Sequence, residues 1–290
     1  VALAADTSLF VTDTGHSRLL LLRADTLQRV VAGPGTEPGK VWHPTGVAAT
    51  SAREKWSYFK DEFVVVIDMD GKRLQKFLWD GTPVRAIRCE DFGYPNADLQ
   101  YVATDYYSQV WVTDKANHCV HKFDRHLNYL DSFGRKGTGK KEFVEPRGIS
   151  IYKRFGQVLI DEKEAAQYYW IGTDVKHLQA EKDEDGFLTI RYFLTEPSYV
   201  TLEIYNSKKK KLATAMDKTW RPAGENMERF TGEWKVVPYV IQNRQRQYSP
   251  DQLEKFPKVK PGTYRLKFSF SATYSSFKYF HKKVERKVVF

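Results

Sequence analysis

Short apolar runs separated by turn residues recur along the first part of the chain. The clearest lies in "VWVTDKANHCVHKF", where β-branched and aromatic residues at 110–112 precede Asp114 and Asn117. Such runs are typical of strands, and Asp and Asn favour the turns between them. We therefore predict a strand at 110–112, a turn set by Asp114 and Asn117, and a returning strand in "VHKFD".

This pattern repeats at a fixed distance. The segment "LFVTDTGHSRLLLL" matches "VWVTDKANHCVHKF", so that Asp13 and Asp114 are 114 − 13 = 101 residues apart. The glycine-rich loops that follow, from Gly33 and Gly134, have the same offset of 134 − 33 = 101. Looser copies begin at residues 62 and 156. A half-period of about fifty residues made of short strands predicts the blades of a β-propeller.

Particular residues mark these copies. The blade-marking positions are Asp13, Gly46, Asp114 and Gly148, with Pro44, Val47, Pro146, Ile149, Val11, Val112, Asn117, Val120 and Phe123 beside them. In this respect the sequence resembles the NHL-repeat β-propeller family over about residues 1–180. The resemblance implies an all-β chain with a four-bladed or incomplete propeller over residues 1–182. Because the family usually has about six blades, the propeller closes with four blades, a neighbouring chain donates further blades, or the chain is a fragment.

The last third of the chain changes in charge and in pattern. Residues 187–290 carry 21 basic and 9 acidic residues, a net charge of +12, whereas residues 1–186 carry 25 and 27, a net charge of −2. The charged segment "AEKDEDG" at 180–186 is therefore predicted to be a linker. Apolar residues alternate over 188–194 and 200–204, which predicts two half-buried strands with Pro197 in the turn.

A second resemblance covers this region. The matching residues are Ala223, Gly224, Glu225, Trp234, Pro261, Gly262, Tyr264 and Leu266. They resemble the immunoglobulin-like domain of the flagellar hook-cap protein, which is also appended to many secreted bacterial proteins. The resemblance implies a C-terminal Ig-like β-sandwich over residues 187–290 with an insertion at about 236–258.

The insertion and one turn supply candidate contact residues. Ser249 followed by Pro250 predicts a short helix near 250–256. We expect protein contacts at Tyr239, Arg244, Arg246 and Tyr248, unless the insertion only covers an edge strand. Lys208, Lys209, Lys210 and Lys211 are candidates for anion contact, or they form a solvated turn.

Sequence motifs favour no catalytic or metal site. Gly134, Gly139 and Lys140 have the spacing of a phosphate-binding loop, but Lys141 replaces the hydroxyl residue that holds magnesium. His118 and His121, three apart on a strand, face opposite sides of the sheet. "DMDGK" starts like a calcium loop, but Trp79 occupies the place of the bidentate glutamate. We expect no catalytic residue, metal or cofactor. The recurring acids Asp13, Asp68, Asp114 and Asp161 either ring the propeller mouth or only mark turns.

These features favour a non-enzymatic interaction protein that self-associates in an oligomer or filament. Alternatives are a metal-dependent lyase or lactonase at the propeller mouth, and a module that binds anionic glycan or nucleic acid through the basic domain. Export to the cell surface or outside a bacterial-type cell is expected. No apolar run long enough to span a membrane occurs, and whether Cys89 and Cys119 form a disulfide is open.

Overall fold

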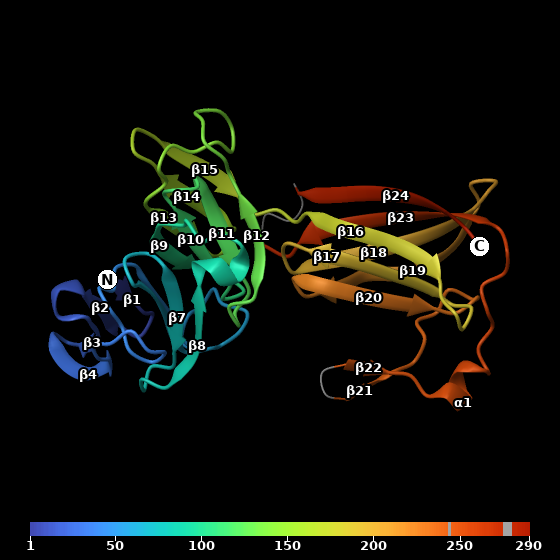
Figure 1. Cartoon of the computed structure of the whole chain (residues 1–290). Coiled ribbons are helices and arrows are strands. Elements are labelled where there is room, and N and C mark those ends of the chain that lie inside the picture. Colours follow the sequence, from blue (N-terminus) through green and yellow to red (C-terminus); the bar gives the residue numbers. More distant parts are fainter. Residues whose placement is uncertain (243–244, 275–279) are drawn as a thin grey trace. The chain divides into compact units, whose positions relative to one another are not determined.

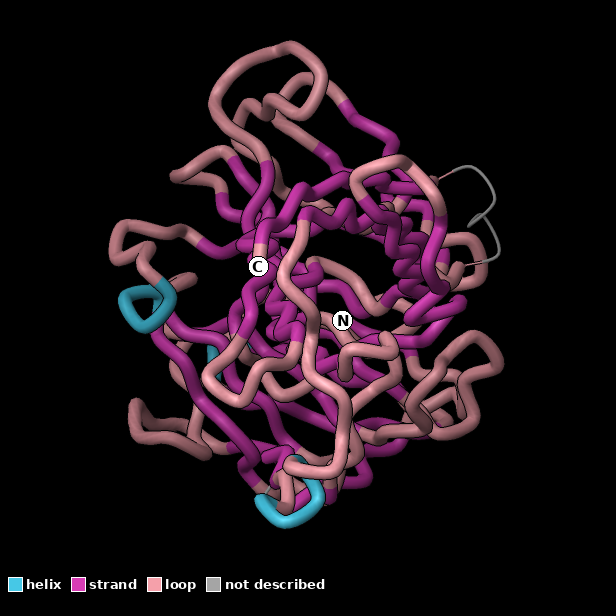
Figure 2. Tube along the Cα trace, turned by 90° about the vertical axis from the view of Figure 1, so that its right-hand side faces the viewer, coloured by secondary structure: helices cyan, strands magenta, loops and turns pink. Residues whose placement is uncertain are grey.

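The computed structural model describes residues 1–242, 245–274 and 280–290, and it is built mainly of strands (Figures 1 and 2). Helical segments in this part are the 3₁₀ turns η1 (Thr14–His16) and η2 (Cys89–Phe92) and the single turn α1 (Pro250–Leu253). None of these helices is long and apolar enough to cross a bilayer. The predicted all-β class is confirmed. The chain divides into two compact units, Val1–Ile171 and Gly172–Phe290.

The first unit consists of four consecutive antiparallel sheets, which we call blades 1 to 4 (Figure 1). Blade 1 contains β1 (Ala2–Leu3), β2 (Leu9–Asp13), β3 (Arg18–Arg23) and β4 (Thr26–Ala32); blade 2 contains β5 (Val47–Thr50), β6 (Phe63–Asp68), β7 (Arg73–Phe77) and β8 (Pro83–Arg88); blade 3 contains β9 (Leu99–Thr104), β10 (Val110–Asp114), β11 (Cys119–Phe123) and β12 (Tyr129–Phe133); blade 4 contains β13 (Ile149–Tyr152), β14 (Gln157–Asp161) and β15 (Ala166–Trp170). Strands pair in chain order, and β1, β5, β9 and β13 lie side by side in succession. This is the arrangement of propeller blades, except that blade 4 has three described strands instead of four.

The predicted turn at Asp114 is confirmed. β10 and β11 are antiparallel partners, with Val110 opposite Phe123. Between them, Asp114 Oδ1 accepts hydrogen bonds from the backbone N–H groups of Ala116 at 3.0 Å and Asn117 at 3.1 Å. The short Asp side chain thus holds the chain reversal that its sequence position predicts.

The glycine-rich loops repeat in conformation as well as in sequence. Gly35 N–H donates to the Val41 carbonyl at 3.0 Å, and Gly137 N–H donates to the Phe143 carbonyl at 3.2 Å. The offset of these contacts is 137 − 35 = 102, one residue more than the 101 expected from sequence. The same structure therefore leads into blade 2 and into blade 4.

Blades 1 to 3 are held together by apolar faces. Val64, Val66 and Phe77 of blade 2 share a buried cluster with blade 1. Phe63 and Val65, which alternate with them, share a buried cluster with blade 3. Because side chains alternate across a strand, β6 is buried on both faces and has a continuous apolar run.

The blade-marking glycines lie where backbones approach closely. A Cβ on Gly46 would be 2.8 Å from the Gln100 carbonyl oxygen of blade 3 and 2.8 Å from Ile67 Cδ1. A Cβ on Gly148 would be 3.0 Å from Asp161 Cβ. These positions therefore serve packing between and within blades.

We predict that Gly46→Ala lowers the free energy of unfolding of the first unit by about 1–3 kcal/mol, because the added methyl group must push blade backbone aside. Denaturant unfolding would measure the change. Gly15→Ala is the matched control, since a Cβ at Gly15 meets nothing within 4 Å. Equal stability of the two variants would show that the close contact of Gly46 with blade 3 leaves room for a methyl group.

The second unit is a two-layer sandwich. Its strands are β16 (Val175–Lys182), β17 (Leu188–Leu194), β18 (Ser198–Asn206), β19 (Lys211–Arg221), β20 (Gly224–Phe230), β21 (Val240–Gln242), β22 (Gln245–Gln247), β23 (Thr263–Ala272) and β24 (His281–Val289). One sheet has the order β16-β17-β20 and the other β19-β18-β23-β24. Alternate residues of both sheets, including Ile190, Leu202 and Phe268, form one buried cluster. β21 and β22 form a separate hairpin.

Three details differ from or refine the sequence expectations. The strands on either side of Pro197 form as predicted, but β17 and β18 lie in different sheets. The units divide between Ile171 and Gly172, earlier than the expected boundary at 182–187, because β16 pairs with β17 and so most of the charged segment belongs to the sandwich. The predicted helix is the single turn α1, whose N-cap Ser249 makes no side-chain capping bond.

Candidate functional site

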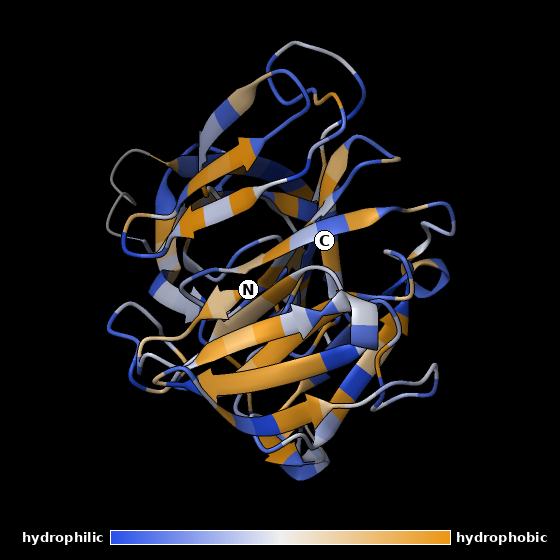
Figure 3. Ribbon diagram, turned by 90° about the vertical axis from the view of Figure 1, so that its left-hand side faces the viewer, coloured by the Kyte–Doolittle hydropathy of each residue, from blue (hydrophilic) through white to orange (hydrophobic). Residues whose placement is uncertain are grey.

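Blade 1 exposes an apolar face. The side chains of Leu3, Leu27 and Val30 are 72%, 52% and 44% exposed. Leu20 and Leu22 between them are half-buried. Figure 3 shows the strands of this sheet, beside the N-terminus, with long hydrophobic stretches. We call this surface, made of Leu3, Leu9, Val11, Leu20, Leu22, Leu27 and Val30, the outward face of blade 1.

Strand register shows what this kind of surface does elsewhere in the molecule. Leu9 lies opposite Leu22 in blade 1, just as Val64 lies opposite Phe77 in blade 2. In blade 2 these two positions are 0% exposed because blade 1 covers them. The residues on the outward face of blade 1 therefore stand at the strand positions that, in blade 2, pack against the preceding blade.

Blade 4 exposes an aromatic face. Tyr152, Leu159 and Tyr168 are 50%, 49% and 52% exposed, and Leu159 lies directly opposite Tyr168. The alternate residues Val158 and Ile160 are buried. We call this surface, with Ser150, Gln157 and Trp170 beside it, the outward face of blade 4. It is more polar than the corresponding face of blade 2.

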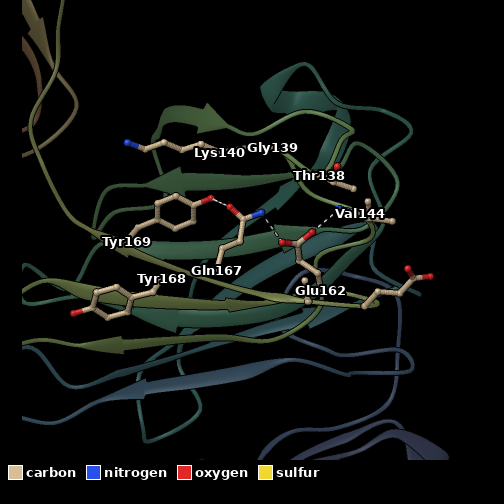
Figure 4. Close-up of a pocket in the computed structure, with 10 residues that line it drawn as sticks. Thr138, Gly139, Lys140, Val144, Glu162, Gln167, Tyr168 and Tyr169 are labelled. Atoms are coloured by element: carbon tan, nitrogen blue, oxygen red, sulfur yellow. Dashed lines mark hydrogen bonds between the residues drawn. The ribbon is translucent and has the colours of Figure 1, made fainter.

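A pocket of about 400 Å³ lies where the glycine-rich loop meets β15 (Figure 4). Its lining residues are Thr138, Gly139, Lys140, Val144, Glu162, Glu164, Ala165, Gln167, Tyr168 and Tyr169. Consecutive side chains of a strand point to opposite faces, and both Tyr168 and Tyr169 line the pocket. The pocket therefore lies at the edge of β15.

A chain of hydrogen bonds fixes one wall of this pocket (Figure 4). Tyr169 donates to Gln167 Oε1, and Gln167 Nε2 donates to Glu162 Oε1 at 2.7 Å. Glu162 Oε2 accepts from the Val144 N–H at 2.6 Å. Burial, together with the charge of Glu162, raises the pKa of Tyr169. The wall is therefore preorganised, with neutral Tyr169 as a donor.

The recurring acids serve structural roles. Asp68 accepts from the Trp42 N–H at 3.2 Å and Asp114 accepts from the Asp98 N–H at 3.0 Å. Each acid thus fastens the segment that leads into its own blade, as Glu162 does through Val144.

The fourth expected acid, Asp161, does not hold the equivalent position. Asp161 N–H donates to the Gly148 carbonyl as Ile67 N–H donates to the Gly46 carbonyl. Asp161 therefore corresponds to Ile67, and Glu162 occupies the place of Asp68. The one-residue shift could have been found in sequence only by aligning Pro-x-Gly with its partner strand. In blade 1, Asp13 pairs with Arg18 and His16.

One buried cluster in blade 3 has donor atoms suited to a metal. Asp114, Cys119 and His121 bring their ligand atoms within 4.8 Å of one another. The 2.9 Å contact joins His121 Nε2 to Asp114 Oδ2, while Nδ1 lies 2.6 Å from Ser132 Oγ. Tyr129 continues this series at 2.7 Å from Ser132. Both ring nitrogens are thus engaged, and the cluster is complete as a hydrogen-bonded core.

Electrostatics agree with this assignment. Burial alone would raise the pKa of Asp114, but bonds from His121, the Asp98 amide and Asn117 outweigh it and hold the pKa at about 2. Burial and the charge of Asp114 raise the pKa of Cys119 to about 12, so the thiol stays protonated. His118 lies apart, in the turn, and accepts from the Glu145 N–H at 3.1 Å.

Sequence reasoning missed this cluster. The spacing Asp-x4-Cys-x-His across a predicted hairpin was the available signal, because antiparallel pairing brings Asp114 opposite Cys119. Cys119 and Cys89 are both buried free thiols, which answers the open question of pairing.

The candidate contact residues of the insertion are partly engaged within the sandwich. Arg246 donates to the Met227 carbonyl of the edge strand β20 and lies 4.4 Å from the ring centre of Tyr239. The hydroxyl of Tyr248 is buried without a hydrogen-bond partner among the described residues. Tyr239 is 38% exposed. Arg244 lies outside the described residues. The geometry favours the alternative in which the insertion covers an edge strand.

The lysine turn is solvated. Asn206 Oδ1 accepts from the backbone N–H groups of Lys208 and Lys210, both at 3.0 Å. Lys211 pairs with Glu203, while Lys209 has a left-handed backbone. All four lysines are exposed, as a solvated turn requires.

Comparisons with known proteins find weak likenesses among solved structures. No protein-family model and no curated protein matches the sequence. Among solved structures, similarity is found to virginiamycin B lyase from Staphylococcus aureus, with 9% identity, 76% of this chain and 68% of that chain covered, and a TM-score of 0.39. Kuenenia stuttgartiensis hydrazine synthase shares 8% identity over 93% of this chain and 75% of that one, with a TM-score of 0.40. The dihydro-heme d1 dehydrogenase NirN shares 10% identity over 97% of this chain and 73% of that one, with a TM-score of 0.36. Likenesses this weak carry no argument about activity, and the architecture stated above rests on the strand order.

Proposed function

We propose that this chain is a non-enzymatic assembly protein that associates head to tail with further copies of itself. The observation that carries the proposal is the outward face of blade 1, which is apolar at the positions where blade 2 is buried. Contiguous exposed apolar surface of this kind marks interaction sites. The occupant that fits it is another propeller blade, because the register is that of a blade interface.

A second copy supplies such a blade. The outward face of blade 4 presents Tyr152, Leu159 and Tyr168, which can cover leucine and valine side chains while tolerating solvent when free. Contact between two different faces is heterologous, so it closes into a ring or extends into a filament. Two copies would form a ring of eight blades, within the range known for propellers.

We infer NHL-type blades from the Pro-x-Gly and Asp positions. We infer an Ig-like sandwich from the sheet orders β16-β17-β20 and β19-β18-β23-β24, which correspond to strands A-B-E and C′-C-F-G. Such sandwiches suit a surface or extracellular assembly, where we place the protein.

The enzymatic and anion-binding alternatives have less support. Asp68, Asp114 and Glu162 are committed to backbone and side-chain hydrogen bonds, which supports a structural reading of the acids. Binding of anionic polymer by the basic sandwich would weaken steeply with salt, whereas association through apolar faces would not.

We predict that Leu20→Glu weakens self-association at least about tenfold, because a buried carboxylate in the interface would lose its hydration. Light scattering across a concentration series would measure this. Leu212→Glu is the control, since Leu212 is 41% exposed on the other unit. Leu159→Glu should weaken association similarly.

Mixing the Leu20→Glu and Leu159→Glu variants tests the head-to-tail geometry. Each mixed pair keeps one intact interface, so association should partly return. A wild-type protein that stays monomeric, or a Leu20→Glu variant that associates normally, would refute the proposal.

A further inference from the structure

The last strand of blade 4, β15, has one sheet neighbour in the part of the chain that the structure describes. Within the described residues β15 pairs with β14 only, whereas blades 1 to 3 each have a fourth strand. Glu162 N–H donates to the Ala165 carbonyl and Ile171 N–H donates to the Gly156 carbonyl. These bonds set the alternation of the antiparallel ladder, so the backbone groups of Ala166 and Tyr168 point away from β14.

The equivalent place in blade 2 is filled. The loop before blade 2 and the loop before blade 4 share left-handed backbone at corresponding positions: Gly39 has φ 92° and Lys141 has φ 59°, while His43 has φ 44° and Glu145 has φ 52°. In blade 2, a Cβ on Gly39 would lie 3.3 Å from Pro83, the first residue of the fourth strand β8. A strand therefore begins against this loop.

At blade 4 the same loop borders the pocket of about 400 Å³ described above. The pocket touches Thr138, Gly139 and Lys140 of the loop and reaches the edge of β15. It lies beside the edge of β15 to which a fourth strand would add, and it includes the place that the Arg73 side chain fills in blade 2, where Ala165 is the corresponding residue. It is large enough for a side chain of such a strand.

We propose that blade 4 binds an extended peptide strand of another polypeptide, antiparallel to β15, with a proline or small apolar side chain in the pocket. The backbone groups of Ala166 and Tyr168 supply main-chain hydrogen bonds. Val144, Ala165 and the ring of Tyr169 supply apolar contact, as lining residues of the pocket. This site uses the edge of blade 4 and goes beyond the proposed self-association, which uses its outward face.

The chain itself provides a probe. The peptide TPVRAIR, residues 82–88, contains the fourth strand of blade 2 with Pro83 at its start. A fluorescent form of this peptide should bind the full chain saturably, while a scrambled peptide should not. On binding, hydrogen exchange of the Ala166 and Tyr168 amides should slow.

Variants at one position separate backbone from side chain. Tyr168→Pro removes the outward N–H without removing a ladder bond to β14, and it should weaken peptide binding at least about fivefold, the equivalent of one hydrogen bond. Tyr168→Ala keeps the N–H and should weaken binding less. Thr138→Trp, in the loop, should block the pocket without changing β15, so it keeps the test valid if Tyr168→Pro disturbs the strand.

The outcomes distinguish this site from self-association. In the Leu20→Glu background, which disables the blade 1 face, peptide binding should persist. Binding unaffected by Tyr168→Pro and Thr138→Trp, or no saturable binding below about 1 mM, would overturn the proposal. Loss of peptide binding in Leu20→Glu alone would show that the edge is not an independent site.

Discussion

Arg73→Met is expected to lower the free energy of unfolding of the first unit by about 3–5 kcal/mol, because it leaves the buried carboxylate of Asp68 without its charged partner. Arg73 and Asp68 are 2% and 0% exposed, and their 2.6 Å contact joins Nη2 to Oδ2. Arg73 also donates to the carbonyl oxygens of Thr36 and Lys40 in the loop before blade 2. The substitution therefore releases a loop as well as an ion pair.

Denaturant unfolding followed by tryptophan fluorescence would measure this loss. Arg53→Met is the matched control, since Arg53 is exposed in the same unit. The transition of the sandwich should be unaffected in both variants, which makes it an internal standard. A loss below about 1 kcal/mol would place the pair among exposed ion pairs and contradict its role in the core.

Asp114→Ala is expected to cost a similar amount, about 3–5 kcal/mol, because several buried donors lose their acceptor together. Asp114 accepts from the backbone N–H groups of Asp98 and Ala116, from both the backbone and the side chain of Asn117, and from His121. The turn and the buried histidine therefore loosen with a single change.

The same residue predicts a pH dependence. The pKa of Asp114 falls from 3.8 to about 2 on folding, so its carboxylate stabilises the folded state above pH 3.8. At 1.36 kcal/mol for each unit by which the pKa is lowered, this contribution is roughly 2 kcal/mol. It is lost as the pH falls from 3.8 through about 2.

Unfolding curves measured at pH 6 and again at about pH 2 would test this pH dependence. The wild-type protein should lose more stability over that interval than Asp114→Ala does. Asp25→Asn, at an exposed turn, is the control and should keep the wild-type pH response. Identical acid sensitivity of wild type and Asp114→Ala would show that other carboxylates dominate acid unfolding.

Local pattern determined the elements of this protein. Alternating or continuous apolar runs, with Asp, Asn and Gly between them, predicted β10, β11 and their turn, and the repeat predicted the blades. The reason is that strand periodicity and turn chemistry act over a few residues. The propeller-like architecture followed from repetition, since each copy must bury its faces on the next.

Only the tertiary structure decided which surfaces remain uncovered. Leu20 and Val65 look alike in sequence, yet one lies on the outward face of blade 1 and the other in a buried cluster. Asp161 looks like a member of the acid series, but the register gives that place to Glu162. The pocket at β15 lies beside a strand that pairs with β14 only among the described residues. Burial and register depend on contacts between residues far apart in the chain, and a local pattern does not contain them.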